Sequence, residues 1–356
     1  MILPRCSLSY LKIVQIGEKC VNSHNHINLN ATITLHMKRY IFYTLFLWLF
    51  TTLICGAQCR EAIPYADFEQ WVTRYITESP LLGGHERSLY AIAPDTVING
   101  AIPYCNLGGS PWATSNAYAN VIGIKKASCT VVPEVREGDD MCARLDSKLE
   151  VVRVLGMIDI EVLVSGSIYL GELYEPIRSV NNPYGKMTMG IPFTKRPKKL
   201  IFDYNLTMSD KGNRIYSTGL SAKKVVQGPD SAEVYILLQH RWEDEMGNVY
   251  AHRIGTGRER FTQSTQGWVN EYAIDVRYGD ISGEAYFRPY MGLLNGKRSY
   301  SCMNSRGKIV PVQEIAWGAP DEEVTHMLVM ASSGCGTAFV GAEGTTLLID
   351  NIFLEY

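Results

Sequence analysis

The sequence predicts an all-β protein, built as an antiparallel β-sandwich or jelly roll with decorated loops, from two observations. Short runs alternate apolar and polar residues with a period of two, which is typical of strands with one buried face. Clusters of Gly, Pro, Asn, Asp and Ser separate these runs, as tight turns between antiparallel strands require. The chain shows no alternation of strand and helix patterns, so a doubly wound parallel sheet is excluded.

The first element along the chain is an expected secretory signal peptide. A basic start at residues 37–39 precedes an apolar run over 41–55, and small residues follow it. A membrane-spanning helix needs about 20 apolar residues, whereas a shorter apolar run after a basic start is typical of export. We expect translation to begin at Met37, cleavage after Ala57, and residues 1–57 to lie outside the fold.

Export predicts a location in the periplasm, at the outer-membrane surface or outside the cell, with no transmembrane segment in the mature chain. Two alternatives stay open. The apolar run is retained as an inner-membrane anchor, or a lipid is attached at Cys55 or Cys59, beside the cleavage point. The residues around both cysteines match a lipid-attachment sequence poorly.

The next element, over Tyr65–Ile76, is expected to be a short helix. Beyond it the sequence predicts strands that include residues 158–162, 167–170, 234–238 and 347–352. Turns are expected at residues 181–185, 209–213, 228–230 and 246–248. Because no repeat or low-complexity linker interrupts the pattern, residues 58–356 are predicted to form one unit, with two packed subdomains as the alternative.

Composition sets limits on the function. The chain has 356 residues, 46% of them hydrophobic and 20% charged, with a formal net charge of −2. This balance predicts a globular protein with a substantial core, and it excludes a basic nucleic-acid-binding protein and intrinsic disorder.

Cysteine usage fits export without fixing a pairing. Of nine cysteines in the chain, those beyond the leader are Cys59, Cys105, Cys129, Cys142, Cys302 and Cys335. An even number in an exported protein permits disulfides, but connectivity cannot be assigned from sequence. No Cys-x-x-Cys motif occurs and the histidines beyond the leader stand singly, so a zinc site is not expected.

Six segments occur together in a recognisable order. They are residues 67–71 (DFEQW), 110–116 (SPWATSN), 143–145 (ARL), 190–197 (GIPFTKRP), 230–238 and 325–356. As a set they resemble the putative carbohydrate-metabolism domain family of exported proteins from glycan-foraging gut bacteria. The resemblance implies a galactose-binding-like jelly roll, similar to carbohydrate-binding modules, and a glycan partner. It implies no particular reaction.

Glu69 near the start and Asp350 near the end look like the paired end strands of carbohydrate-binding jelly rolls. Calcium prefers six to eight oxygen ligands at about 2.3–2.6 Å, so these two carboxylates are candidates to hold a structural calcium ion that would tie the first strand to the last. The alternative is a solvated Glu and a strand-edge Asp with no ion. No cofactor for chemistry is expected.

Aromatic residues beside turns are candidates for sugar contact, because sugar rings stack on exposed aromatic faces while their hydroxyls need polar partners. Trp112 follows the turn-rich residues 108–111, and Asn116 is close to it. The full set of predicted ligand-binding residues is Trp112, Asn116, Trp268, Tyr286, Arg288 and Tyr290. The alternative is that these aromatic rings belong to the core.

Three functions follow, in order of preference. The first is an exported, non-catalytic protein that binds a poly- or oligosaccharide. The second is a glycoside hydrolase or lyase with an unrecognised carboxylate pair, for which no catalytic residue can be assigned. The third is a structural or adhesive envelope protein with protein partners. The cationic run at residues 193–199 suits either an acidic polysaccharide or, as we prefer, a solvated turn.

Overall fold

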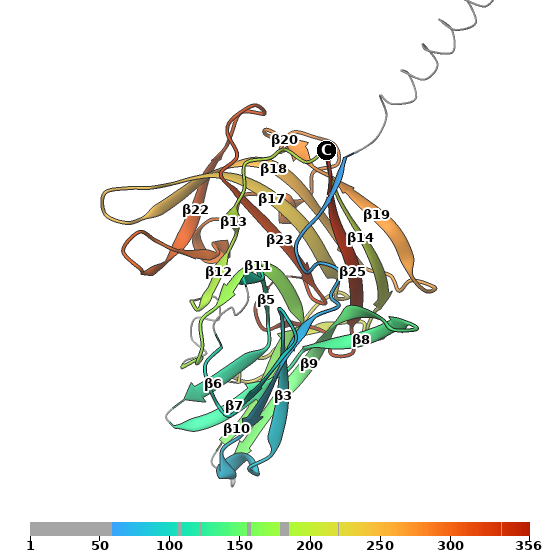
Figure 1. Ribbon diagram of the computed structural model, residues 1–356, viewed down its shortest axis with the longest axis vertical. Helices are drawn as coiled ribbons and strands as arrows, with labels where there is room; N and C mark the ends of the chain where they lie inside the picture. Colours follow the sequence, from blue (N-terminus) through green and yellow to red (C-terminus); the bar gives the residue numbers. More distant parts are fainter. Residues whose placement is uncertain are drawn as a thin grey trace, which may run out of the picture. The chain divides into compact units, whose positions relative to one another are not determined.

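The computed structural model describes residues 59–104, 109–121, 123–154, 158–178, 185–219, 221–335 and 337–356. The predicted leader and Cys105 lie outside these residues. Two large and three small β-sheets dominate the described chain (Figure 1), and its helical elements are the 3-10 turns η1 (Pro80–Leu82), η3 (Pro289–Met291) and η4 (Gly296–Arg298). The β-sandwich prediction is confirmed. None of the described helical elements has the length and hydropathy to cross a bilayer.

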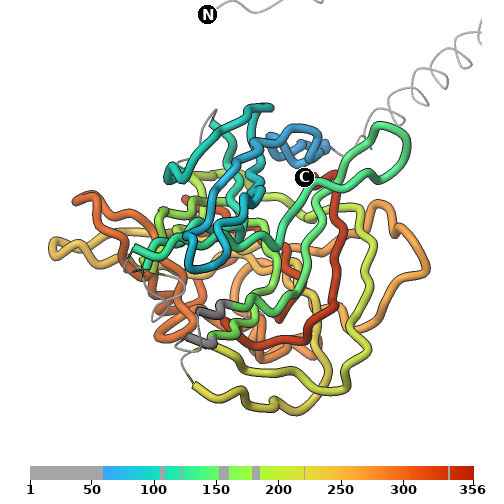
Figure 2. Tube along the Cα trace, turned by 90° about the horizontal axis from the view of Figure 1, so that it is seen from below, coloured from blue at the N-terminus to red at the C-terminus, as the bar shows by residue number. Residues whose placement is uncertain are grey.

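One large sheet has seven strands. They are β1 (Arg60–Ala62), β8 (Val131–Glu137), β9 (Asp140–Val154), β10 (Ile158–Ser165), β14 (Lys199–Thr207), β19 (Val269–Asp275) and β25 (Thr346–Glu355). The order is β10-β9-β25-β14-β19, with β1 beside β25 and β8 beside β9. The antiparallel pairing of β1 with β25 places the start of the described chain against its end, as predicted (Figure 2).

The other large sheet has ten strands. They are β5 (Trp112–Thr114), β11 (Ser167–Leu173), β12 (Met187–Met189), β13 (Ile191–Pro192), β17 (Ala232–Glu243), β18 (Val249–Phe261), β20 (Arg277–Tyr278), β21 (Ser301–Met303), β22 (Ile309–Trp317) and β23 (His326–Ser332). The order is β13-β23-β17-β18-β22-β21-β12-β11-β5, with β20 beside β18. The expected turn at 246–248 joins the antiparallel pair β17 and β18.

Three small sheets complete the described chain. They contain β2 (Trp71–Thr77), β3 (Glu86–Ile92) and β4 (Thr96–Asn99); β6 (Ala117–Val121) and β7 (Ile124–Ser128); and β15 (Arg214–Tyr216), β16 (Lys224–Val226) and β24 (Val340–Gly341). The strands predicted at 158–162, 167–170, 234–238 and 347–352 lie within β10, β11, β17 and β25.

The short helix expected over Tyr65–Ile76 is wrong. The segment forms a turn and then most of strand β2. The backbone φ angles of Tyr65 and Phe68 are 61° and 48°, and a right-handed helix cannot contain such values. The β-branched residues of β2 favour an extended conformation because their side chains are stiff.

The main core lies between the two large sheets. Phe202 of β14 and Ile349 of β25 pack there with Val234 and Ile236 of β17. The alternate residues of β17 point to the other side of the ten-stranded sheet, where Tyr235 belongs to a second apolar cluster. Residues 279–300, which follow β20, supply Leu294 and Tyr300 to this cluster. A loop therefore covers the outer face of the ten-stranded sheet.

Candidate functional site

Trp112 and Asn116 lie in the interior. The Trp112 side chain is 1% exposed, its indole Nε1 donates a hydrogen bond to the carbonyl of Pro64 at 2.9 Å, and its ring meets Phe68 edge-on. The Asn116 amide donates to the carbonyls of Tyr90 and Val131 and accepts two backbone N–H groups. The expectation that Trp112 is exposed is wrong, because Pro64 and Phe68, far from it in the chain, contact its indole ring.

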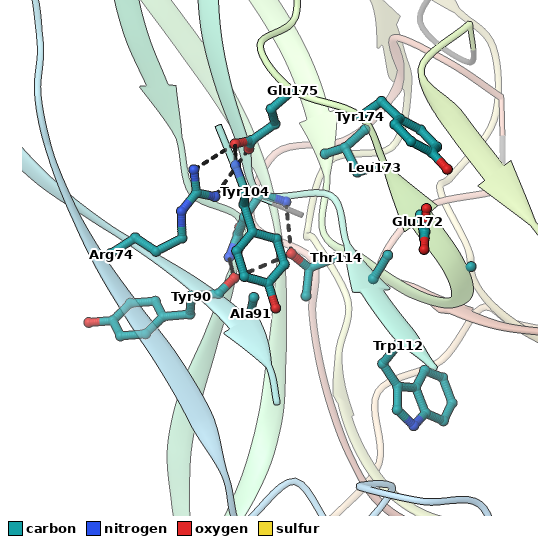
Figure 3. Close-up of a pocket in the computed structure, with 13 residues that line it drawn as sticks. Arg74, Tyr90, Ala91, Tyr104, Trp112, Thr114, Glu172, Leu173, Tyr174 and Glu175 are labelled. Atoms are coloured by element: carbon teal, nitrogen blue, oxygen red, sulfur yellow. Dashed lines mark hydrogen bonds and ion pairs between the residues drawn. The ribbon is translucent and has the colours of Figure 1, made fainter. Parts of the chain in front are cut away.

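A small cavity beside Trp112 is closed by a buried ion pair (Figure 3). Arg74 and Glu175 are 3% and 2% exposed and are linked at 2.6 Å. The Glu175 carboxylate also accepts the backbone N–H groups of Tyr104 and Tyr118. The cavity measures about 50 Å³, room for a few water molecules at roughly 10–15 Å³ each. This region therefore stabilises the fold and offers little space to a sugar.

Trp268 is half-buried and lies beside a second charged cluster. The guanidinium of Arg136 lies 4.3 Å from the centre of the indole ring. Its Nη1 contacts Asp203 at 2.8 Å and Asp350 at 2.6 Å. Burial raises the pKa of Asp350 to about 6, and the Arg136 hydrogen bond opposes this shift. The cluster occupies one side of the Trp268 ring.

Glu69 and Asp350, the predicted calcium ligands, both contact protein groups in the structure. The Glu69 carboxylate accepts the backbone N–H of Met141, and an Asp350 oxygen is taken by the Arg136 cation. Among the described residues, no group of three or more His, Cys, Asp or Glu side chains could hold a metal ion. The first and last strands of the described chain, β1 and β25, are joined by antiparallel pairing.

The cysteines of the described chain form no disulfide, and two lysines of the cationic run at residues 193–199 are paired with glutamates. In the described part of the chain Cys59, Cys129, Cys142, Cys302 and Cys335 are free thiols. Burial raises the pKa of Cys142 to about 12. In the cationic run, Lys195 pairs with Glu61 and Lys199 pairs with Glu355. The preferred interpretation of that run, a solvated turn, agrees with these partners.

Tyr286, Arg288 and Tyr290 lie on the loop that covers the ten-stranded sheet. Tyr286 is 41% exposed, with the Arg277 guanidinium 5.5 Å from its ring centre. Arg288 is exposed and donates to backbone carbonyls of its own loop. Tyr290, in η3, is half-buried and lines a cavity. Of the predicted ligand-binding residues, Tyr290 is the one that borders this larger space.

That cavity has a volume of about 240 Å³ and a basic lining. Its charged and aromatic members are Arg258, Arg260, Tyr290, Lys297, Arg298 and Tyr300. Strand β18 supplies the two arginines Arg258 and Arg260, η3 supplies Tyr290, and η4 supplies Lys297 and Arg298. Tyr300 directly precedes β21. No Asp or Glu appears in its lining among the described residues. We call this space the basic cavity.

Strand geometry explains why buried Arg258 and half-buried Arg260 lie together. Arg258 and Arg260 are two residues apart on β18, so they point to the same side of the sheet. In the β17–β18 register, Glu233 lies opposite Arg260 and Tyr235 lies opposite Arg258. One carboxylate on β17 therefore faces two guanidinium groups.

Glu233 is shared between these two arginines. Its Oε1 accepts the Nε–H of Arg258 at 2.7 Å together with an Nη2–H of the same residue, and its Oε2 accepts the Nε–H of Arg260 at 2.6 Å. Burial is the largest single influence on the pKa of Arg258 and lowers it, but the interactions with Glu233, Tyr300 and Tyr235 together outweigh burial, so the pKa is raised. Arginine side chains stay protonated in proteins, so the two guanidinium groups have one negative charge between them.

One N–H group of this network is unused. Arg258 is 6% exposed, and its Nη1 is buried with no hydrogen-bond partner among the described residues. Leaving a buried donor unpaired costs about 1–3 kcal/mol. Arg260, by contrast, donates its Nη2–H to the carbonyl of Cys335 at 2.7 Å and lies 4.6 Å from the Tyr290 ring centre.

A comparison with family models matches residues 68–278 to the putative carbohydrate metabolism domain. The chain belongs to this family. The match confirms the family resemblance that the sequence motifs indicated and assigns a carbohydrate-related domain to the region containing Glu233, Arg258 and Arg260. A search of curated proteins found no match.

Two solved structures are similar to this carbohydrate metabolism domain protein. One, described as a putative glycoside hydrolase from Bacteroides thetaiotaomicron, has 18% sequence identity and a TM-score of 0.41, covering 77% of this chain and 76% of that chain. Another, described as a putative glycoside hydrolase from Bacteroides vulgatus, has 13% identity and a TM-score of 0.38, covering 83% and 94%.

Sequence reasoning missed the buried charges of the carbohydrate metabolism domain. Glu233, Arg258 and Arg260 lie within strands whose residues are mostly buried on both faces. A charged residue in such a run needs a partner or a ligand, so this pattern was the available signal. The pairing of Glu233 with both arginines depends on the β17–β18 register, which the sequence does not state.

Proposed function

We propose that this carbohydrate metabolism domain protein binds a poly- or oligosaccharide in the basic cavity. The observation that carries the proposal is a cavity of about 240 Å³ that combines the aromatic ring of Tyr290 with guanidinium donors. Small-molecule sites typically join apolar or aromatic walls to a few placed polar groups. A sugar ring needs both, since its C–H face stacks on an aromatic ring and its hydroxyls accept hydrogen bonds.

The surroundings of Tyr290 favour a fixed platform. The Arg260 guanidinium lies over the ring at 4.6 Å, and Pro289 precedes Tyr290 in η3. A cation over an aromatic face is attracted to it, and a ring held in place before binding loses less conformational entropy on binding. We therefore place the sugar-stacking role at Tyr290.

The cavity favours binding over hydrolysis. Glycoside hydrolysis uses two carboxyl groups on either side of the scissile bond, and no Asp or Glu belongs to the lining that the structure describes. Asp203 and Asp350 do form a close pair, but they are 8% and 0% exposed and both contact Arg136. The proposal is therefore a carbohydrate-binding protein.

Export belongs to the proposal as well. It is supported by the basic start at residues 37–39 and the apolar run at 41–55. A binding protein that is exported would meet polysaccharide outside the cytoplasm. The mass of the N-terminal peptide of protein recovered from the producing cells would show whether the chain is cut after Ala57.

A glycan array with the purified protein tests the binding proposal. We expect binding to a subset of glycans, lost in Tyr290→Ala and retained in Tyr286→Ala. Tyr286 is a matched control because it lies on the same loop and is exposed, but it does not line the cavity. An array without signal for the folded protein, or equal loss in both variants, would contradict the proposal.

A further inference from the structure

We infer that the carbohydrate bound in the basic cavity carries an anionic oxygen group, either a uronate carboxylate or a sulfate ester. The inference rests on the proposed function and adds the charge of the ligand to it. It is carried by the balance of charges around the cavity and by the unused N–H of Arg258.

The lining of the cavity holds four cationic side chains. Arg258 and Arg260 share the single carboxylate of Glu233. Lys297 and Arg298 are exposed on η4, and the described chain offers neither of them an ion-pair partner, although Arg298 donates to the carbonyl of Leu293. The side chains that β18 and η4 contribute to the cavity therefore carry more positive charge than their carboxylate partner carries negative charge.

The carboxylates of Asp230 and Glu259, whose residues neighbour Arg260 in space or in sequence, are directed elsewhere. Asp230 accepts the backbone N–H groups of Ser231 and Ala342. Glu259 points to the opposite side of β18, where it accepts the hydroxyl of Tyr272. Neither belongs to the lining, so neither fills the place that a bound anion would take.

Burial makes the surplus charge costly. Arg258 is 6% exposed, so its charge is poorly hydrated, and its Nη1 has no hydrogen-bond partner among the described residues. Buried charges are normally paired and hydrogen-bonded. A neutral sugar would leave the surplus uncompensated, whereas a ligand with a negative group would compensate it.

The chemistry of the arginines suits an oxyanion. Guanidinium groups bind carboxylates and related oxyanions through charge-assisted hydrogen bonds, which are roughly twice as strong as neutral ones. The volume of about 240 Å³ exceeds what a small free anion needs, and Tyr290 supplies a ring for stacking. Both features favour an anionic group that is part of a sugar.

Titration calorimetry with matched glycan pairs tests the inference. One pair is trigalacturonate and its methyl ester, and the other is a carrageenan oligosaccharide, a sulfated galactan, and its neutral desulfated form. We expect at least one acidic member to bind at least tenfold more tightly than its partner, with an affinity that falls as salt rises. The responding pair distinguishes carboxylate from sulfate.

Variants connect the preference to this cavity. Lys297→Ala combined with Arg298→Ala changes two exposed side chains, so the fold should be kept. The double variant should weaken binding of the acidic member at least fivefold and leave its circular dichroism spectrum unchanged. Lys308→Ala, an exposed cation outside the lining, is the matched control and should bind as the parent protein does.

The outcomes separate this inference from the proposed function. Equal binding of acidic and neutral members, lost in Tyr290→Ala, would overturn the inference and keep carbohydrate binding. Binding of inorganic sulfate with no affinity for any sugar would overturn both, since no sugar would then occupy the site. An acidic preference that the double variant retains in full would place the anion elsewhere and overturn the inference.

Discussion

Two arginines on the same face of β18 are buried beside a glutamate, but their surroundings differ. Arg253 and Glu314 are each 0% exposed and form two hydrogen bonds, with Arg253 Nε to Glu314 Oε1 at 2.7 Å. The remaining Nη1 of Arg253 donates to Thr256 and to the carbonyl of Met291. Every guanidinium nitrogen of Arg253 has a partner within the protein.

The network of Arg258, Arg260 and Glu233 is not fully paired in this way. Two arginines share Glu233, and the Nη1 of Arg258 has no partner among the described residues. The difference teaches that two buried ion-pair networks of the same residue types can differ in their balance of charges and hydrogen-bond partners. The proposed binding site is at the unbalanced network, which a ligand with a negative group would complete.

A third cluster has the opposite imbalance. One cation, Arg136, contacts the carboxylates of both Asp203 and Asp350. Burial raises the pKa of Asp350 to about 6 against the pull of Arg136. The surplus there is negative, and a proton can compensate it. The three clusters thus respond differently to substitution, pH and ligand.

The largest expected effect is on the fully hydrogen-bonded pair of Arg253 and Glu314. Arg253→Met leaves the Glu314 carboxylate buried without its cation, and we expect a loss of about 3–5 kcal/mol in the free energy of unfolding. Urea denaturation of the variant and the parent measures it. A loss below about 1 kcal/mol would show that the closed network contributes little to stability.

The next effect depends on pH. Asp350 has a folded-state pKa of about 6, above its ordinary value of 3.8, so the folded state binds this proton more tightly than the unfolded state does. Its contribution to stability is present below about pH 4 and is lost as pH rises through about 6. Asp350→Asn removes this titration. Relative to the parent, the variant should gain on the order of 2–3 kcal/mol between about pH 4 and pH 7.

Denaturation of both proteins across this pH range measures the difference. The informative quantity is how the difference in unfolding free energy between variant and parent changes with pH, since the substitution also alters contacts at every pH. Parallel stability curves for parent and variant would contradict the shifted pKa of Asp350.

The smallest effect on stability is expected in the network of Arg258, Arg260 and Glu233. Arg258→Met removes the unpaired N–H and leaves Glu233 paired with Arg260, so we expect a loss of about 1–3 kcal/mol, less than for Arg253→Met. Binding of an acidic glycan should fall at least tenfold in the same variant. Urea denaturation and calorimetry measure the two quantities. Equal destabilisation by both substitutions, with unchanged binding, would remove the distinction between the two networks.

Much of the fold could be predicted from the sequence. The strands within β10, β11, β17 and β25 and the turn before β18 follow from local patterns, and the adjacency of first and last strands was implied by the resemblance to carbohydrate-binding jelly rolls. The segment before Ile76 was mispredicted because its positive backbone angles at Tyr65 and Phe68 have no signature in those residue types.

The candidate site could be predicted only in part. Tyr290 was recognised as an aromatic residue beside turns, and it does border the basic cavity. Trp112 had the same signature, yet it is 1% exposed because Pro64 and Phe68, far from it in the chain, pack against it. Exposure of a large ring depends on what the rest of the chain places over it.

The sequence by itself determined that the chain forms antiparallel strands and belongs to a carbohydrate-related family, because alternation and motif order are properties of short segments. Only the tertiary structure decided where charge is left over. Glu233, Arg258, Arg260 and the 279–300 loop come from separate parts of the chain, and their balance exists only once β17 pairs with β18 and the loop covers them. A surplus charge is a sum over neighbours in space, and neighbours in space are set by folding.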